Sequence, residues 1–88
     1  MFVIDIKLTA TNITEKEITA HRAWFKQYFD QGKFLLVGPR TEIDHAGIII
    51  AQVDSRQELD QIISQDVFYP NDASYQVMSF KANLNALT

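Results

Sequence analysis

The sequence contains no cysteine among its 88 residues. That absence excludes disulfide bonds, thiolate metal sites, iron–sulfur clusters and a cysteine nucleophile. Glycine is scarce as well, and none of the three glycines lies in a glycine-rich phosphate loop. A G-x-S-x-G nucleophile elbow is also missing. Any chemistry must therefore come from other side chains.

The sequence also lacks a surplus of basic residues. Eight lysine and arginine residues stand against eleven aspartate and glutamate residues, which gives a formal net charge of −3. The basic residues are scattered singly along the chain, so they form no patch that would neutralise a run of phosphates. We therefore expect no nucleic-acid partner.

Long hydrophobic runs are absent too. The apolar stretch near the start has no basic leader and is interrupted by Asp5 and Lys7, so we expect neither a signal peptide nor a membrane span. With 47% hydrophobic and 22% charged residues, the composition is that of an ordinary globular protein. The length suits one domain, residues 1–88. We expect a cytoplasmic protein without membrane contact.

Periodicity predicts a first strand and a first helix. Apolar and polar residues alternate over residues 1–8, which is the period of a strand. Thr14 and Glu17 form a capping-box pattern at the start of the helix, and Gly32 follows its expected end near Gln31. The apolar stripe of this helix consists of Ile18, His21, Phe25, Tyr28 and Phe29, whereas Glu17, Arg22 and Lys26 are expected to point away.

The rest of the chain predicts three more strands and one more helix. Apolar runs over residues 34–37, closed by Gly38 and Pro39, and over residues 46–53 read as strands. Ser55 and Glu58 repeat the capping-box pattern before a short helix that ends near residue 65. Alternation returns over residues 74–81. This order predicts an α+β, ferredoxin-like βαββαβ fold, an antiparallel sheet with both helices on one face.

The composition of the middle strands predicts a dimer. Both of their faces are apolar: Phe34 and Leu36 alternate with Leu35 and Val37, and Ile48 and Ile50 alternate with Ile49, Ala51 and Val53. A sheet face of this kind left in water is an association surface. We therefore expect a homodimer in which the bare sheet faces of two chains pack together.

His21 is a polar residue in the apolar stripe of the first helix, and Asp66 follows the second helix. In this fold the loop that carries Asp66 can come round toward the first helix. A carboxylate bonded to one imidazole nitrogen would leave the other as a general acid or base near neutral pH. The alternative is a buried histidine satisfied by a backbone carbonyl or a tyrosine hydroxyl, with the aspartate bonded to its local backbone.

Five segments of the chain, in order, resemble the landmarks of the YciI-like (YCII-related) proteins. They are His21–Phe25 (HRAWF), Gly32, Leu35–Pro39 (LLVGP), Gly47–Ala51 (GIIIA) and Asp66–Phe68 (DVF). The resemblance implies a dimeric α/β-barrel built from ferredoxin-like chains. It also implies a small pocket with a catalytic dyad, a histidine on the first helix and an aspartate after the second, which here are His21 and Asp66.

One landmark departs from the family pattern. The family usually reads Asp-Pro-Phe, whereas here Val67 replaces the proline and Pro70 comes three residues later. This change leaves the path of the loop open and predicts a less rigid backbone there, although the aspartate and the aromatic residue of the landmark remain. A few relatives in this family act on chlorinated or hydroxylated aromatic rings or on lactones.

Further candidates for substrate binding flank the expected pocket. They are Gly38, Pro39 and Arg40 at the end of the second strand, and Phe68 and Tyr69 in the loop. The sequence does not decide whether Tyr75, in the last strand, also reaches the pocket. The planar guanidinium of Arg40 could hold a substrate carboxylate, or it could remain a solvated loop residue. His45 has no partner at metal-ligand spacing. We predict no metal and no cofactor.

The leading hypothesis is a small cofactor-independent enzyme. His21, oriented by Asp66, would move a proton on a small organic substrate in an elimination, isomerisation or hydrolysis. The alternatives are a non-catalytic dimeric module that binds a small molecule, and a structural dimer with a satisfied core histidine. A solvent-connected cavity at the two side chains would favour the first two over the third.

Overall fold

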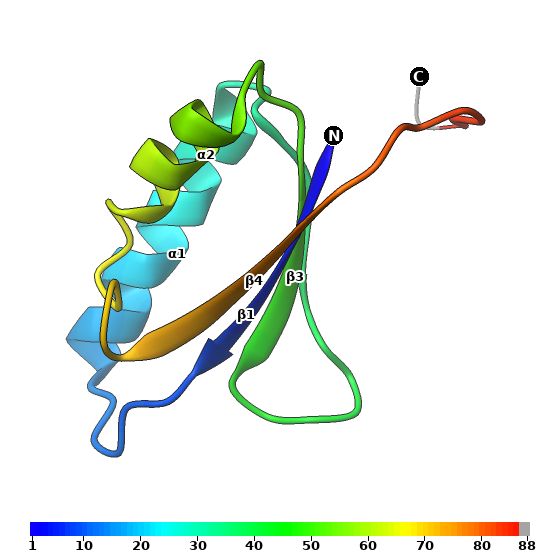
Figure 1. Ribbon diagram of the computed structural model, residues 1–88. Coiled ribbons are helices and arrows are strands. Elements are labelled where there is room, and N and C mark those ends of the chain that lie inside the picture. The colour runs from blue at the N-terminus through cyan, green and yellow to red at the C-terminus, as the bar shows by residue number, and fades with distance from the viewer. Residues whose placement is uncertain (87–88) are drawn as a thin grey trace.

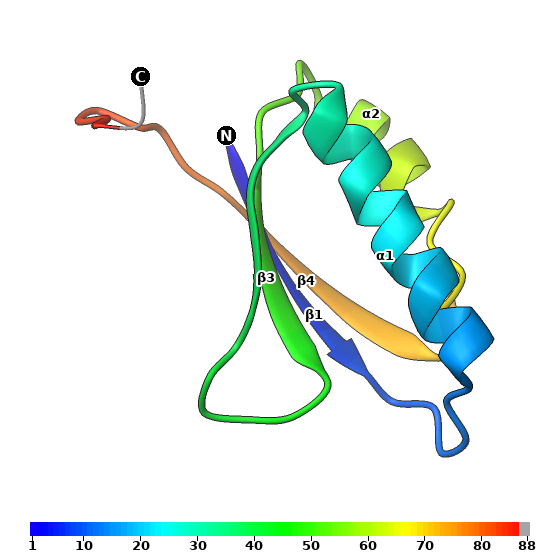
Figure 2. The ribbon, with the colours of Figure 1, turned by 180° about the vertical axis from the view of Figure 1, so that it is seen from behind.

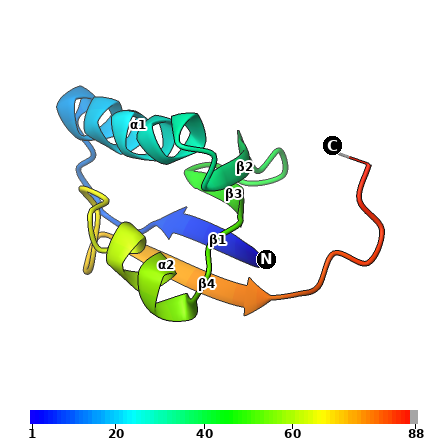
Figure 3. The same ribbon diagram turned by 90° about the horizontal axis from the view of Figure 1, so that it is seen from above.

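A computed structural model describes residues 1–86 as four strands and two helices. They are β1 (Phe2–Leu8), α1 (Glu15–Asp30), β2 (Phe34–Pro39), β3 (Ala46–Ala51), α2 (Arg56–Ile63) and β4 (Ala73–Ser79). The strands form one antiparallel sheet in the order β2-β3-β1-β4. Both helices cover the same face of this sheet (Figures 1 and 3). The predicted ferredoxin-like fold is confirmed.

The alternation in β1 directs every second side chain toward the helices. Ile4 and Ile6 are buried on that face, and Phe2 and Leu8 pack against the same core. The core is completed from the other elements by Trp24, Tyr28, Phe34, Ile49, Ala51, Leu59, Ile62, Ile63, Phe68 and Ala73. The hydrophobic core therefore lies between the sheet and the two helices.

Both ends of α1 are fixed by local hydrogen bonds. Thr14 accepts the backbone N–H of Glu17 at 3.1 Å, and the Glu17 carboxylate accepts the backbone N–H of Thr14 at 3.0 Å. At the other end Gly32 adopts φ +78°, and the N–H of the residue after it donates to the carbonyl of Tyr28 at 2.9 Å. These are a complete capping box and a Schellman-type end, and both confirm the predicted boundaries.

The buried face of α1 differs from the predicted stripe. Trp24 and Tyr28 are buried, whereas Phe29 is 51% exposed, so the prediction for Phe29 was wrong. The Trp24 indole N–H donates to the backbone carbonyl of Ile62 in α2 at 2.8 Å. A buried tryptophan needs such an acceptor, and its large ring then sets which side of the helix faces inward.

A β-bulge changes the alternation in β2. Phe34 and Leu36 are two residues apart, but their partners in β3 are consecutive. The extra residue, Leu35, brings Phe34 and Val37 onto the same face, where both contact the core. Leu36 is 48% exposed on the other face. The predicted strict alternation through residues 34–37 was therefore wrong.

The start of α2 carries half of the predicted capping box. Ser55 accepts the backbone N–H of Glu58 at 3.1 Å, as expected. The Glu58 carboxylate, however, accepts from the Lys33 ammonium at 2.7 Å and from the Asp54 backbone N–H at 3.3 Å. The second bond of the box is thus replaced by an ion pair that joins α2 to the segment before β2.

The face of the sheet opposite the helices is bare in residues 1–86 (Figure 2). Its apolar side chains are Val3, Leu36, Ile48, Ile50 and Met78. We refer to this surface as the open face. Within the part of the chain that is described, neither helix has the length and apolar character needed to cross a membrane.

Candidate active site

Asp66 lies in the loop between α2 and β4, and this loop turns its side chain inward. The backbone N–H of Tyr69 donates to the Asp66 carbonyl at 3.0 Å, and that of Asp72 donates to the Phe68 carbonyl at 3.0 Å. Phe68 is fully buried, and the Tyr69–Pro70 peptide bond is cis. The loop with Val67 in place of the family proline therefore still presents both its aspartate and its phenylalanine to the core.

The Asp66 carboxylate bonds two side chains from different elements. Its Oδ1 atom lies 2.7 Å from Nδ1 of His21, and its Oδ2 atom accepts the Tyr75 hydroxyl at 2.6 Å. The Asp66 side chain has no exposed surface, whereas the His21 side chain is 15% exposed. The contact predicted between His21 and Asp66 is thus present, and Tyr75 from β4 completes it.

These contacts assign the protons on the three groups. Burial, together with the bond to the Asp66 carboxylate, raises the pKa of the Tyr75 phenol above its ordinary value, so Tyr75 remains a donor. An ionised Asp66 has only acceptor sites. The neutral imidazole of His21 must then carry its proton on Nδ1, which leaves Nε2 as the basic atom.

Aromatic rings hold the imidazole of His21 on three sides. Its centroid lies 5.7 Å from Trp24, 5.4 Å from Phe25 and 5.3 Å from Phe68. Within residues 1–86, no hydrogen bond reaches Nε2 of His21. The ring is therefore fixed by packing and by Asp66, while its second nitrogen stays available.

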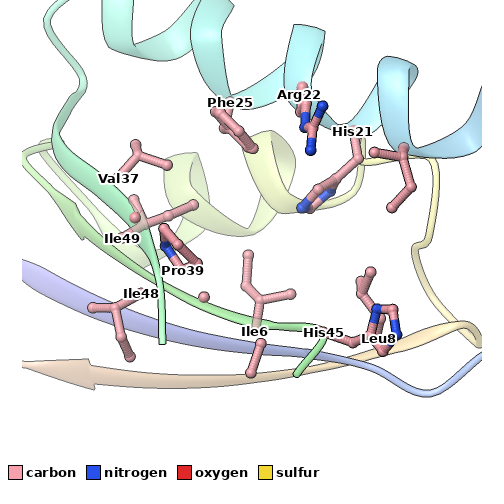
Figure 4. A pocket seen from close by; sticks show the side chains of 14 residues that line it. Ile6, Leu8, His21, Arg22, Phe25, Val37, Pro39, His45, Ile48 and Ile49 are labelled. Carbon is pink, nitrogen blue, oxygen red and sulfur yellow. The ribbon is translucent and has the colours of Figure 1, made fainter. Parts of the chain in front are cut away.

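A cavity of about 330 Å³ opens beside His21, between α1 and the β2–β3 end of the sheet. Figure 4 shows the His21 ring directed from α1 into this cavity. The apolar lining includes Ile6, Leu8, Ile18, Phe25, Val37, Pro39 and Ile49, with Gly38 and Gly47 in the strands. The cavity reaches the imidazole but not Asp66, which lies behind it. We refer to it as the His21 pocket.

The other predicted binding residues divide into two groups. Gly38 and Pro39 line the His21 pocket, and their contact with a substrate stays a prediction. Arg40 does not, because its guanidinium pairs with Glu42 and lies 3.4 Å from Asp5 on the open side of the sheet. The placement of Arg40 beside the pocket was therefore wrong.

The two loop aromatics also lie outside the pocket lining. Phe68 is a fully buried core residue, and its ring lies 5.3 Å from the His21 ring. Tyr69 is 45% exposed, its ring lies 5.9 Å from that of Tyr75 at a tilt of 49°, and it borders a separate, more polar hollow between α2 and β4. Their predicted direct contact with a substrate at the His21 pocket has no support in this arrangement.

Two basic side chains that were not assigned to the pocket also line it. Arg22, expected to point away from the sheet, extends from α1 toward the cavity beside His21 (Figure 4). His45 approaches from the β2–β3 connection, where it adopts φ +58° and its carbonyl accepts the Leu8 N–H at 2.8 Å. Helical spacing gave no signal for Arg22, because a long side chain can bend back over its own helix.

The described residues contain no group of three or more histidine, cysteine, aspartate or glutamate side chains placed to hold a metal ion. His21 and His45 are the two histidines of the chain, and both border the pocket. Imidazole side chains at these positions can transfer protons and form hydrogen bonds.

Comparison with known proteins identifies similar solved structures and a family. The structure resembles 5-chloro-2-hydroxyhydroquinone dehydrochlorinase (TftG) from Burkholderia phenoliruptrix AC1100, solved in complex with 2,5-dihydroxybenzoquinone. The TM-score is 0.68 at 17% sequence identity, and the match covers 92% of this chain and 94% of that chain. No curated protein sequence matches significantly.

The sequence itself matches the YCII-related domain over residues 1–81, which is nearly its whole length. That match spans all six elements, His21 and Asp66. The chain therefore belongs to the YCII-related domain family.

Proposed function

We propose that this protein is a small cofactor-independent enzyme that transfers a proton on a small organic substrate. The observation that carries the proposal is the state of the two nitrogens of His21. Nδ1 lies 2.7 Å from a fully buried carboxylate oxygen, and the ring that carries Nε2 is directed into the His21 pocket. A histidine that served only the core would have no such open side.

In this proposal Nε2 accepts a proton from a substrate bound in the pocket. The imidazolium that forms is stabilised by the Asp66 carboxylate, which keeps its negative charge and its bond to Nδ1–H. Tyr75 holds the other carboxylate oxygen and so fixes the orientation of the pair. The same nitrogen then returns the proton to the substrate or to a leaving group.

The dehydrochlorinase relative supports an elimination as the first reaction to test. Removal of hydrogen chloride requires a base at one position and loss of chloride from another, and His21 supplies such a base. The apolar lining and modest volume of the pocket suit a single ring. Isomerisation and hydrolysis of compounds of the same size use the same proton transfer.

An activity screen tests the proposal. Chlorinated and hydroxylated aromatic rings and lactones are incubated with the wild type, and product formation and deuterium uptake from D₂O are followed by NMR. We expect a substrate whose turnover falls by about 100-fold or more in His21→Gln and falls clearly in Asp66→Asn. Equal turnover in His21→Gln would refute the catalytic role. Binding without turnover of any compound would favour the non-catalytic binding module instead.

We further propose that two chains associate through the open face. Leu36 and Met78 are 48% and 54% exposed there, and the face also carries Asp5 and Lys7, which have opposite charges. Within residues 1–86, Oδ1 of Asp5 is buried and has no hydrogen-bond partner. A second copy packed on this face would cover the apolar side chains and bring complementary charges to the two-fold interface.

A further inference from the structure

We propose that Arg22 selects the substrate of the His21 pocket, and that this substrate is a small planar ring compound with an anionic oxygen. This inference rests on the proposed function and names its substrate class. Three polar side chains line the pocket, His21, Arg22 and His45, and all of them are basic. Among the described residues, no carboxylate lines it.

Arg22 differs from the other two arginines of the chain in its partners. Arg40 pairs with Glu42 and Asp5, and Arg56 pairs with Asp60 at 2.8 Å. Within residues 1–86, the Arg22 guanidinium takes part in neither an ion pair nor a hydrogen bond. A guanidinium presents a planar fork of donors that matches a carboxylate or a related oxyanion. Its counter-ion can therefore come from a bound ligand.

The position of Arg22 fits a ligand that also reaches His21. The two residues are adjacent in α1, and both side chains extend from the helix toward the same cavity (Figure 4). The remaining wall beside them is apolar, formed in part by Phe25, Val37 and Ile49. A ring packed on this wall can place an anionic oxygen at Arg22 and a neighbouring position at Nε2 of His21.

Arg22 is an exposed residue, so solvent screens its charge and a simple ion pair there would contribute little. The preference must therefore come from directed, charge-assisted hydrogen bonds that the planar guanidinium fork donates to the ligand. The charge-assisted bonds expected at Arg22 correspond to a preference of about tenfold or more for an anion over a neutral compound of the same shape.

The test uses benzoate and benzamide, which share shape and differ in charge. Binding is measured by calorimetry and by NMR shifts of pocket residues in the wild type, in Arg22→Gln and in Lys26→Gln. Lys26→Gln is the matched control, because it also removes one positive charge from α1, one turn away. Lys26 pairs with Asp30 and does not line the pocket. Circular dichroism checks that each variant is folded.

We expect the wild type and Lys26→Gln to bind benzoate about tenfold or more tightly than benzamide. In Arg22→Gln the affinity for benzoate should fall to that for benzamide, while benzamide binding stays unchanged. Absence of a preference in the wild type, or its survival in Arg22→Gln, would overturn the inference.

A fourth variant separates this inference from the proposed function. His21→Gln removes the base but retains Arg22, so it should keep the preference for benzoate. If that preference holds and no compound exchanges a proton, the proposed function fails and the inference on Arg22 stands. If proton exchange depends on His21 but Arg22→Gln still prefers benzoate, the inference fails and the proposed function stands.

Discussion

At the scale of single residues, the orientation of His21 depends on a chain of two hydrogen bonds behind it. Tyr75 donates to one oxygen of Asp66, and the other oxygen lies 2.7 Å from Nδ1 of His21. The carboxylate is fully buried, so each lost donor leaves a charged oxygen without compensation. Tyr75 is therefore a positioning residue that acts on the imidazole through Asp66.

We expect Tyr75→Phe to destabilise the fold by about 1–3 kcal/mol, because Oδ2 of Asp66 loses its donor while remaining buried. Urea unfolding measures this change. The Nδ1–H proton resonance of His21 should move as well, because the Asp66 carboxylate would then accept a side-chain hydrogen bond from His21 but no longer from Tyr75. Tyr69→Phe is the control, because the Tyr69 ring is 45% exposed and its hydroxyl is not bonded to Asp66. Equal unfolding midpoints and an unmoved resonance in both variants would contradict the positioning role.

At the scale of elements, the sequence predicted the order of strands and helices and the limits of α1. Thr14, Glu17 and Gly32 act through bonds to residues three or four positions away, and such local patterns are visible in one sequence. The bulge at Leu35 was not predictable, because an insertion leaves no mark in a run that is apolar at every position.

Part of the candidate site could likewise be predicted from the sequence, and part of it could not. The resemblance to the family identified His21 and Asp66, and their contact is present at 2.7 Å. Arg22 and Arg40 were placed the wrong way round, with Arg22 at the pocket and Arg40 on the other side of the sheet. The end of a long, flexible side chain depends on charged partners that lie far away in the sequence, such as Asp5 for Arg40.

The end of α1 offers a test at this scale. Gly32 adopts φ +78°, and a Cβ atom added there would contact nothing within 4 Å. Gly32→Ala should therefore lower the free energy of unfolding by about 1 kcal/mol through backbone strain alone. Gly32→Asn should cost less, since asparagine enters the left-handed region more readily. Thermal unfolding of the two variants measures the order, and an alanine variant as stable as the wild type would show that the helix end tolerates another conformation.

At the scale of the whole molecule, the two faces of the sheet differ in what covers them: the helices cover one face and leave the open face bare in residues 1–86. Ile49 faces the helices and is 2% exposed, whereas its neighbour Ile50 lies on the open face. The proposed dimer would cover Ile50 and leave the environment of Ile49 unchanged. Substitutions at these two adjacent positions of β3 should therefore affect folding in one case and association in the other.

We expect Ile50→Glu to give a folded monomer, because it places like charges opposite each other across the two-fold interface. Ile49→Glu should prevent folding, since it buries an unpaired charge in the core. Sedimentation at micromolar concentration, with circular dichroism, distinguishes the two. Gln27→Glu on the exposed side of α1 is the control and should remain a dimer. A wild type that sediments as a monomer at this concentration would refute the proposed association.

The proposed function requires the His21 imidazole to keep its proton on Nδ1 and to offer an unprotonated Nε2 to the pocket. The ¹⁵N chemical shifts of its two ring nitrogens, followed through a pH titration up to the end point at high pH, test this most directly. His45 is the other histidine of the chain, so a His45→Gln sample assigns the signals. We predict a protonated Nδ1 and an unprotonated Nε2 for His21, and loss of that preference in Asp66→Asn. A wild-type His21 protonated on Nε2 would contradict the account, because no basic nitrogen would then face a substrate.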